Sequence, residues 1–328
     1  MRRLTAILLS VHLAVTISSL AGTRRDDVAD INFINLGADP LYSSVGRFTY
    51  SVGSSSYIAS GVLISPDWVL TAAHVVEGNN FLGGGITNMT FSLTAGSSTF
   101  VYTAMQWIPH PGWAVTSANV FAGFDIGLVR LSSQTTAVNP ATLYASPLTT
   151  ALPATIVGYG SSGTGSTGFL AGTAGTKRAG QNMIEATGDN YSISSGILFA
   201  DFDDPLDPAK NIIGSPTPLP LEYSPAPGDS GGGLFVTQGV NTYLMGITSF
   251  GWGFRDNVPD ASYGDLAGFV AVSPHLSWIQ STIAPVTVMS VGAAVPEPGT
   301  WIAAAGLVLL AVARYRRGSR VSRRRSPR

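Results

Sequence analysis

Short β-like runs separated by turn residues are the feature that most limits what this chain can fold into. The runs are rich in β-branched and aromatic residues, and 38 glycines and 20 prolines supply turns between them. They lie at 48–52, 57–64, 99–108, 126–131, 154–158, 197–202, 234–236, 242–250 and 268–272. With 11% charged residues, long amphipathic helices are disfavoured. We expect a mainly β protein with a loop or pair of turns at 158–176 and a closing helix at 273–283, capped by Ser273.

The length and the cysteine count limit how such a protein is stabilised. A chain of 328 residues that is 45% hydrophobic can bury the core of one large domain or two modest ones. It contains no cysteine, so no disulfide contributes. Stability must come from packing, with a bound metal as a further option.

The first 21 residues have the form of an export signal. Arg2 and Arg3 precede an apolar run from Leu4 to about Val15, and Ser19 and Ala21 are the small residues expected before a cut after Ala21. The run is too short for a membrane anchor. A buried helix of the fold is the alternative, but it does not explain the two leading arginines.

The last residues, 295–328, also carry a membrane-directed pattern. "VPEPG" at 295–299 is followed by an apolar stretch at 301–313 and then by eight arginines. This order resembles the PEP-CTERM sorting signal of Gram-negative bacteria, which an exosortase reads and cuts near the Pro-Glu-Pro. The resemblance implies an exosortase-type partner, transient membrane contact of the apolar helix, and sorting to the cell envelope, surface or exterior. An ordinary tail anchor is the alternative.

Charge separates the tail from the body. Residues 22–299 hold 8 basic and 19 acidic residues, a net charge of −11, whereas the tail is strongly basic. An acidic body argues against nucleic acid or an anionic membrane as its partner, because both require positive charge to replace released counterions.

Three polar residues interrupt the β pattern and together suggest a chemistry. His74 follows an apolar run, Asp125 opens a strand-like run, and Ser230 lies in "GDSGGG". A serine hydroxyl is a poor nucleophile, so an imidazole must take its proton and a carboxylate must orient that imidazole. Each residue alone is more often structural, but the set fits acyl transfer.

The glycines around Ser230 fit the same chemistry. Four glycines in this loop, among them Gly228, allow sharp backbone turns. The amides of Gly228 and Ser230 can then point at one place where a carbonyl oxygen becomes negative. The sequence therefore predicts an oxyanion hole beside the nucleophile.

These motifs resemble those of the trypsin or chymotrypsin superfamily of serine endopeptidases. The matching segments are TAAH around His74, DIGLVRL around Asp125 and GDSGGG around Ser230, with "HPGW" at 110–113 and "GITSFG" at 246–251 in the expected places. The resemblance implies two antiparallel β-barrels over 45–283, with the site between them and no cofactor. It also implies that Ser249 hydrogen-bonds Asp125 and contacts substrate.

The resemblance gives a weaker prediction of specificity. It places Ser224 at the floor of the pocket for the residue before the scissile bond, with Gly251 and Gly268 as its walls. Because Ser224 is neutral, we expect a preference for bulky apolar or aromatic residues. Glu222 is an alternative source of negative charge.

Activation departs from the family pattern. In the family a new N-terminus pairs with the residue that corresponds to Asp229, but no typical N-terminal motif appears in residues 22–44. That segment is a candidate propeptide, with Arg24 and Arg25 as a cleavage site or a solvated pair. Whether Asp229 meets an amine, a side chain or neither is left open.

An acidic stretch, "DFDDPLDP", suggests either calcium or a solvated turn. It contains Asp201, Asp203, Asp204 and Asp207, but its spacing fits no EF-hand, so the turn is favoured and no metal site is predicted. His110 and His275 are expected to be structural.

Two functions stay in view from the sequence. The preferred one is a secreted serine endopeptidase that acts on proteins or peptides through an acyl-enzyme. The alternative is a catalytically silent relative that binds proteins or polysaccharide at the cell surface. A complete set of triad and oxyanion residues favours the first, because binding alone requires none of them together.

Overall fold

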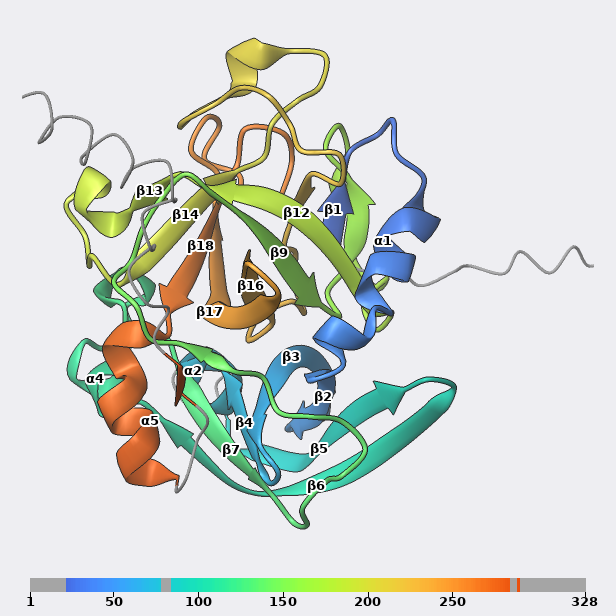
Figure 1. The fold of residues 1–328 in the computed structure, drawn as a ribbon, viewed down its shortest axis with the longest axis vertical. Coiled ribbons are helices and arrows are strands. Elements are labelled where there is room, and N and C mark those ends of the chain that lie inside the picture. The colour runs from blue at the N-terminus through green and yellow to red at the C-terminus, as the bar shows by residue number, and fades with distance from the viewer. Residues whose placement is uncertain (1–21, 78–83, 284–287, 290–328) are drawn as a thin grey trace, which may run out of the picture. The chain divides into compact units, whose positions relative to one another are not determined.

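A computed structural model describes residues 22–77, 84–283 and 288–289, all within one unit that ends at Met289. The six strands of its first half close into a barrel in the order β2-β3-β4-β7-β6-β5 (Figure 1). Their bounds are Val45–Val52 (β2), Ser55–Ser65 (β3), Trp68–Thr71 (β4), Ile86–Ala95 (β5), Ser98–Pro109 (β6) and Gly127–Leu131 (β7). Neighbouring strands are antiparallel throughout, as predicted for the first barrel.

The second half forms a curved antiparallel sheet in the order β12-β9-β16-β17-β18-β14-β13. The bounds are Leu152–Gly158 (β9), Arg178–Ile184 (β12), Ala186–Thr187 (β13), Ile197–Asp201 (β14), Gly233–Gln238 (β16), Asn241–Trp252 (β17) and Leu266–Ala271 (β18). Strands β12 and β14 also contact each other, which brings the ends of the sheet together as a half-barrel. The short strand β8 (Leu143–Tyr144) pairs with β17, and β19 (Val288–Met289) pairs with β8. The predicted two-barrel, mainly β architecture is confirmed.

All nine predicted strand-like runs fall on strands, and the closing helix is present. It consists of a 3-10 turn, Ser273–His275 (η5), followed by α5 (Leu276–Thr282). The turn begins after Val272, so Ser273 is not its cap as predicted. The stretch 158–176 was expected to be a loop or a pair of turns, and it contains two short strands, β10 (Ser162–Thr164) and β11 (Gly168–Phe169), which pair as a small hairpin.

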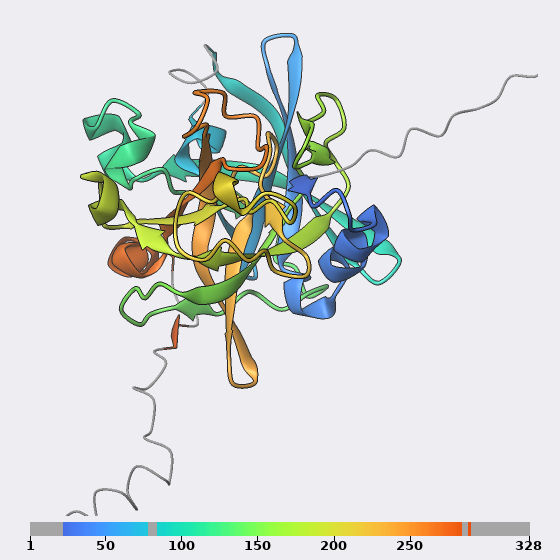
Figure 2. The same ribbon diagram turned by 90° about the horizontal axis from the view of Figure 1, so that it is seen from above.

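The N-terminal segment is built into the fold. Strand β1 (Gly22–Arg24) lies between β10 and β15 (Tyr223–Ser224), and it is followed by α1 (Asp30–Gly37) and a 3-10 turn, Pro40–Tyr42 (η1). Helix α1 packs on β12, as Figures 1 and 2 both show. Phe33 of this helix is completely buried. The segment therefore contributes to the core of the second half.

A buried ion pair fixes α1 to the sheet. The side chain of Arg178 in β12 is fully buried. Its Nε donates to Oδ1 of Asp30 and its Nη2 donates to Oδ2, both at 2.7 Å. A charge taken out of water is tolerated only when it is paired, and this bidentate geometry pairs two of the three guanidinium nitrogens. The third, Nη1, is buried without a hydrogen-bond partner among the described residues.

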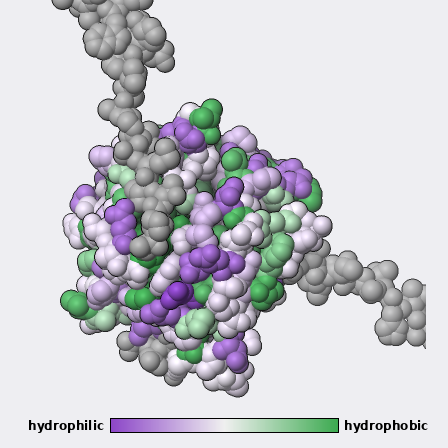
Figure 3. Space-filling view, turned by 60° about the horizontal axis from the view of Figure 1, so that its bottom comes forward, coloured by the Kyte–Doolittle hydropathy of each residue, from purple (hydrophilic) through white to green (hydrophobic). Residues whose placement is uncertain are grey.

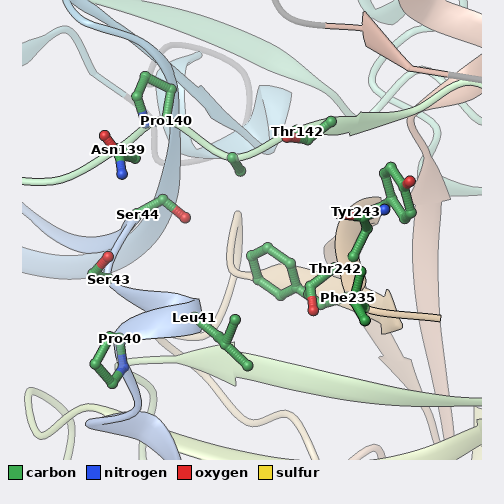
Figure 4. Close-up of a pocket in the computed structure, with 13 residues that line it drawn as sticks. Pro40, Leu41, Ser43, Ser44, Asn139, Pro140, Thr142, Phe235, Thr242 and Tyr243 are labelled. Atoms are coloured by element: carbon green, nitrogen blue, oxygen red, sulfur yellow. The ribbon is translucent and has the colours of Figure 1, made fainter. Parts of the chain in front are cut away.

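The surface of the domain is mixed in hydropathy. On the face drawn in Figure 3, hydrophilic and hydrophobic residues are interspersed. One hollow of about 230 Å³ lies between η1, the segment 139–142 and the β16–β17 hairpin. Figure 4 shows the side chains that line it. Among the described residues no helix has the length and apolar content needed to span a bilayer, and the predicted apolar helix at 301–313 lies outside them.

We predict that Asp30→Asn destabilises the domain by about 3 kcal/mol or more, because it leaves the buried Arg178 charge without its partner. Chemical denaturation followed by intrinsic fluorescence measures the change. Asp27→Asn is the matched control, because Asp27 is half exposed in its pair with Arg25 and should cost less than about 1 kcal/mol. Equal effects of the two variants would contradict this role of Asp30.

Candidate active site

The structure brings His74 and Asp125 into direct contact. His74 lies in the short helix α2 (Ala73–Val76), directly after β4, and Asp125 lies just before β7. Strands β4 and β7 are paired, so the two residues meet at one edge of the first barrel. Nδ1 of His74 is 2.7 Å from Oδ2 of Asp125, and the amide of His74 donates to Oδ1 at 2.9 Å.

Asp125 also contacts the second half of the molecule. Oγ of Ser249, in β17, donates to Oδ2 of Asp125 at 2.5 Å. Asp125 is completely buried, and three donors satisfy its oxygens. The predicted contact between Ser249 and this carboxylate is therefore present in the structure.

Ser230 lies at the turn before β16 and is braced by the first barrel. Its carbonyl accepts a hydrogen bond from the amide of Ser60 in β3 at 2.9 Å, and Oγ of Ser60 donates to the carbonyl of Gly228 at 2.9 Å. Ser230 and His74 line the same pocket. The three predicted residues thus come together where the two halves meet.

The loop has the conformation that its glycines were expected to permit. Gly228 has φ of +101° and Gly231 has φ of +80°, and a Cβ on Gly231 would collide with Thr71 and the Ser60 carbonyl. The amides of Gly228 and Ser230 donate to no acceptor within the described part of the chain. By contrast, the amide of Asp229 donates to the carbonyl of Ala226, and the amide of Gly231 donates to that of Thr248. Two unbonded amides beside a serine are what an oxyanion hole requires.

Asp229 has partners within the domain. Its Oδ1 accepts from the amide of Gly160 at 2.7 Å, and its Oδ2 accepts from the amide of Ala226 at 2.9 Å and from the Tyr223 hydroxyl at 3.3 Å. Complete burial raises the pKa of Asp229 to about 6, although these three donors oppose the shift. The question left open by the sequence is answered: backbone amides and a tyrosine hold this carboxylate.

The pocket beside Ser230 has a volume of about 280 Å³. Of the residues predicted to bind substrate, Ser224, Ser249 and Gly251 line it. Gly268 does not, because it pairs with Phe250 across β17 and β18, and a Cβ there would strike the phenyl ring. Phe250, whose ring covers Gly268, lines the pocket instead, and the role of Gly268 as a pocket wall stays a prediction.

The alternative negative charge, Glu222, is also absent from the pocket lining. It is 1% exposed and accepts the amide of Leu219 at 2.6 Å, and burial raises its pKa to about 9. A carboxylate that sequence reasoning missed does line the pocket: Asp265, just before β18. Its position directly ahead of a strand, like that of Asp125, was the signal available in the sequence.

The strand β1 holds two parts of the pocket lining in place. Thr23 is completely buried, and its Oγ1 donates to the carbonyl of Ala261 at 2.7 Å and contacts that of Ser224 at 3.3 Å. Ser224 and Ala261 both line the pocket. The N-terminal segment therefore supports the substrate side of the candidate site.

The acidic stretch is not the solvated turn that was expected. Asp201, Asp203 and Asp204 are at least nine-tenths buried, and Asp204 pairs with Lys210 at 2.7 Å. Within the described residues no three His, Asp or Glu side chains are grouped so that they would hold a metal ion. His110 and His275 have structural contacts, since His110 caps a short helix and His275 contacts the carbonyl of Gly123 at 3.0 Å.

Comparison with known proteins identifies the family. The trypsin family model matches residues 39–279, and the PEP-CTERM protein-sorting motif matches residues 294–317. Chymotrypsin-like elastase family member 1 of Macaca fascicularis is 29% identical over 253 residues, covering 76% of this chain and 87% of the relative. Kallikrein 1-related peptidase b3 of Mus musculus is 33% identical over 116 residues, which are 32% of this chain and 41% of that protein.

A further match, to the complement C1s subcomponent of Sus scrofa, is 38% identical over 96 residues, which are 28% of this chain and 14% of that protein. The fold and the arrangement of His74, Asp125 and Ser230 agree with these matches. This chain belongs to the trypsin family of serine endopeptidases. It also carries a bacterial signal for export and sorting to the envelope or surface.

We predict that the domain becomes less stable as pH rises from about 5 to 9. Burial raises the pKa of Asp229 to about 6, of Asp265 to about 7, of Glu185 to about 8 and of Glu222 to about 9. The unfolded chain releases these protons near pH 4, whereas the folded state still holds them. The stability that these protonated carboxyl groups contribute is therefore complete below about pH 4. It is lost as pH rises through their raised pKa values.

Thermal unfolding at a series of pH values measures this trend. Glu222→Gln should flatten the upper part of the curve, because it removes the group with the highest of these pKa values. Asp189→Asn, at an exposed carboxylate that does not contribute to any of these four pKa shifts, is the control and should leave the slope unchanged. A melting temperature that is higher at pH 9 than at pH 5 would show that these groups do not control stability.

Proposed function

We propose that this protein is an exported serine endopeptidase that hydrolyses peptide bonds in protein or peptide substrates through an acyl-enzyme. The observation that carries the proposal is the Asp125 carboxylate, which binds His74 Nδ1 on one side and Ser249 Oγ on the other, beside a pocket that Ser230 lines. The family match supports the same reaction class.

The geometry leads to a sequence of proton transfers. A proton on Nδ1 of His74 is held by Asp125, which leaves the lone pair of the neutral ring on Nε2. His74 takes the Ser230 proton as Oγ attacks the substrate carbonyl carbon, and it then gives that proton to the departing amine as the peptide bond breaks. Water, deprotonated by His74, attacks the acyl-enzyme and releases the acid.

The negative oxygen of each tetrahedral intermediate needs donors that are already in place. The amides of Gly228 and Ser230 are proposed for this task because neither is used within the described fold. The loop is rigid at this point, since Ser60 bonds it from the first barrel and Asp229 bonds it from within the second half. Little reorganisation would accompany the reaction.

We propose the following division of the chain. Residues 1–21 are the export signal, and residues 284–294 link the protease domain to the sorting signal at 295–328, which an exosortase-type enzyme reads in a Gram-negative-type cell envelope. The segment 22–44, a candidate propeptide from the sequence, is proposed to remain in the active protein, because Thr23 of β1 holds two residues of the pocket lining and α1 contributes to the core.

A silent, protein- or polysaccharide-binding relative is the competing function. No contact in the described residues favours it over catalysis, whereas the buried hydrogen bonds of Asp125 are of use mainly for orienting His74. The same machinery would also serve an esterase, which differs only in the leaving group.

The first test is labelling of the exported domain by a fluorophosphonate, which reacts only with an activated serine. We expect labelling of the wild type and of Ser97→Ala, a control at an exposed serine, and none of Ser230→Ala. Asp125→Asn should lower kcat on a casein or peptide library by about 10⁴-fold, the loss typical of such triads. A folded wild-type domain that neither labels nor cleaves would support the silent alternative.

A second test concerns the N-terminal segment. Thr23→Val should destabilise the domain by about 1 to 3 kcal/mol, because the Ala261 carbonyl loses the hydroxyl that donates to it and the Ser224 carbonyl loses a weaker contact with the same hydroxyl. Thr87→Val, which removes one long, exposed hydrogen bond, is the matched control. N-terminal sequencing of the active exported protein should find Gly22 first; an active form that begins after residue 44 would overturn the proposal that the segment is retained.

A further inference from the structure

A larger pocket, of about 690 Å³, shares no lining residue with the one beside Ser230. The first barrel contributes residues of β2, β5 and β6 to it, and the second half contributes Tyr159 and the segment 175–177. Helix α1, the turn η1 and the connecting segment 137–139 complete the lining. Its volume and its place between the two halves are typical of sites that bind small molecules.

The basic residues of the domain are few, and most of them are paired. Residues 22–283 contain eight lysines and arginines. Five of these have a carboxylate within 4.0 Å, namely Arg24, Arg25, Arg130, Arg178 and Lys210. Of the other three, Arg255 is exposed, whereas Arg47 and Lys177 are half-buried. Both half-buried cations without a carboxylate partner among the described residues line the larger pocket.

The donors of these two cations are only partly used within the described residues. Nη1 of Arg47 donates to the carbonyl of Gly175 at 3.2 Å, but Nε of Arg47 is buried without a hydrogen-bond partner. Nζ of Lys177 donates to the carbonyl of Tyr42 at 2.6 Å, which is one of the three hydrogen bonds that an ammonium group can donate. Burial lowers the pKa of Lys177 to about 7. Two desolvated cations side by side in one lining are unfavourable unless an anion joins them.

Tyr159 adds a hydroxyl to the same lining. It is 5% exposed, and its oxygen, near Arg47 and Thr94, is buried without a hydrogen bond of ordinary geometry. Burial raises the pKa of Tyr159 to about 12, so the hydroxyl keeps the proton that it can donate. One carboxylate, Asp39, also lines the pocket, but it accepts the amide of Leu41 at 2.9 Å and forms no ion pair with either cation.

The other walls of the pocket are partly apolar. Ile34 of α1, Ala95 of β5 and the pair Ala137 and Val138 belong to the lining. A ligand with an acidic group at one end and a hydrocarbon body would satisfy the cations and bury its body against these walls. Residues 22–299 have a net charge of −11, which repels a polyanion at long range, so a small ligand fits the pocket better than a nucleic acid or a membrane surface.

We propose that this pocket binds a small organic anion, whose carboxylate or phosphate group accepts hydrogen bonds from Arg47 and Lys177 and whose apolar body packs against Ile34 and Val138. The site lies outside the candidate triad, and the proposal does not depend on the protein being a protease. Tyr159 is the third donor to the acidic group.

The test is calorimetric binding of small aromatic probes to the exported protein at pH 6, where Lys177 is protonated. We expect phenylacetate or phenyl phosphate to bind with a Kd of about 1 mM or lower. The neutral isostere phenylacetamide should bind at least about tenfold more weakly than phenylacetate, because it cannot form charge-assisted hydrogen bonds. Comparison of the two anions identifies the preferred acidic group. Inorganic phosphate should bind more weakly than phenyl phosphate, because it lacks the apolar body.

Substitution of the two cations ties the binding to this pocket. Arg47→Gln and Lys177→Gln should each weaken binding of the better anion at least about tenfold. Arg255→Gln is the matched control and should bind as the wild type does. Arg255 also donates to a carbonyl, that of Ala209 at 2.6 Å, and also lacks a carboxylate partner in the described part of the chain, but it is exposed and outside the pocket lining.

A folded wild type that binds neither anion would overturn the proposal, as would anion binding that survives in both Arg47→Gln and Lys177→Gln. Equal binding of phenylacetamide and phenylacetate would also overturn it, because the cations would then have no role. If Arg47→Gln does not fold, Lys177→Gln provides the comparison, since it removes a half-buried charge that has no carboxylate partner. Ser230→Ala should bind the anions as the wild type does, so failure of this site and failure of the proposed catalysis are separate results.

Discussion

The buried Asp125 carboxylate is the contact on which the candidate site depends. It lies at the edge of the first barrel, and its oxygens accept hydrogen bonds from His74 beside it and from Ser249 in β17 of the second half. A fully buried carboxylate is stable only when such donors are present, so the requirement to satisfy it also fixes how the two halves meet. Ser60 adds a second connection by holding the Ser230 loop from β3.

The environment around this contact is strongly desolvated and acidic. Several carboxyl groups in the second half are buried, and most of them have amide or hydroxyl partners rather than cations. At Asp229 and Glu222, hydrogen bonds from the backbone therefore take the place of ion pairs, and the sequence provides no disulfide. Asp229 illustrates this, since Gly160, Ala226 and Tyr223 shape the nucleophile loop from within the fold.

Local patterns in the sequence predicted the strands and the triad contacts, but they did not predict details that depend on tertiary partners. Strand β12 has polar residues at buried positions, and it is stable because Arg178 meets Asp30 and Asn182 meets two carbonyls. No periodic apolar pattern marks such a strand. The cover over Gly268 has a related cause: the register of β17 and β18 sets it opposite Phe250, and the sequence alone does not give that register. Asp265 was missed because only the fold brings it to the same pocket as Ser230.

The position of β1 has a practical consequence for anyone who produces this protein. Gly22 is buried, has φ of +61° and lies against the Tyr223 ring, whose hydroxyl contacts Asp229. An affinity tag or fusion partner joined directly ahead of Gly22 would extend from a buried strand two residues from the pocket-supporting Thr23. Tags for purification therefore belong after Met289, where the described domain ends.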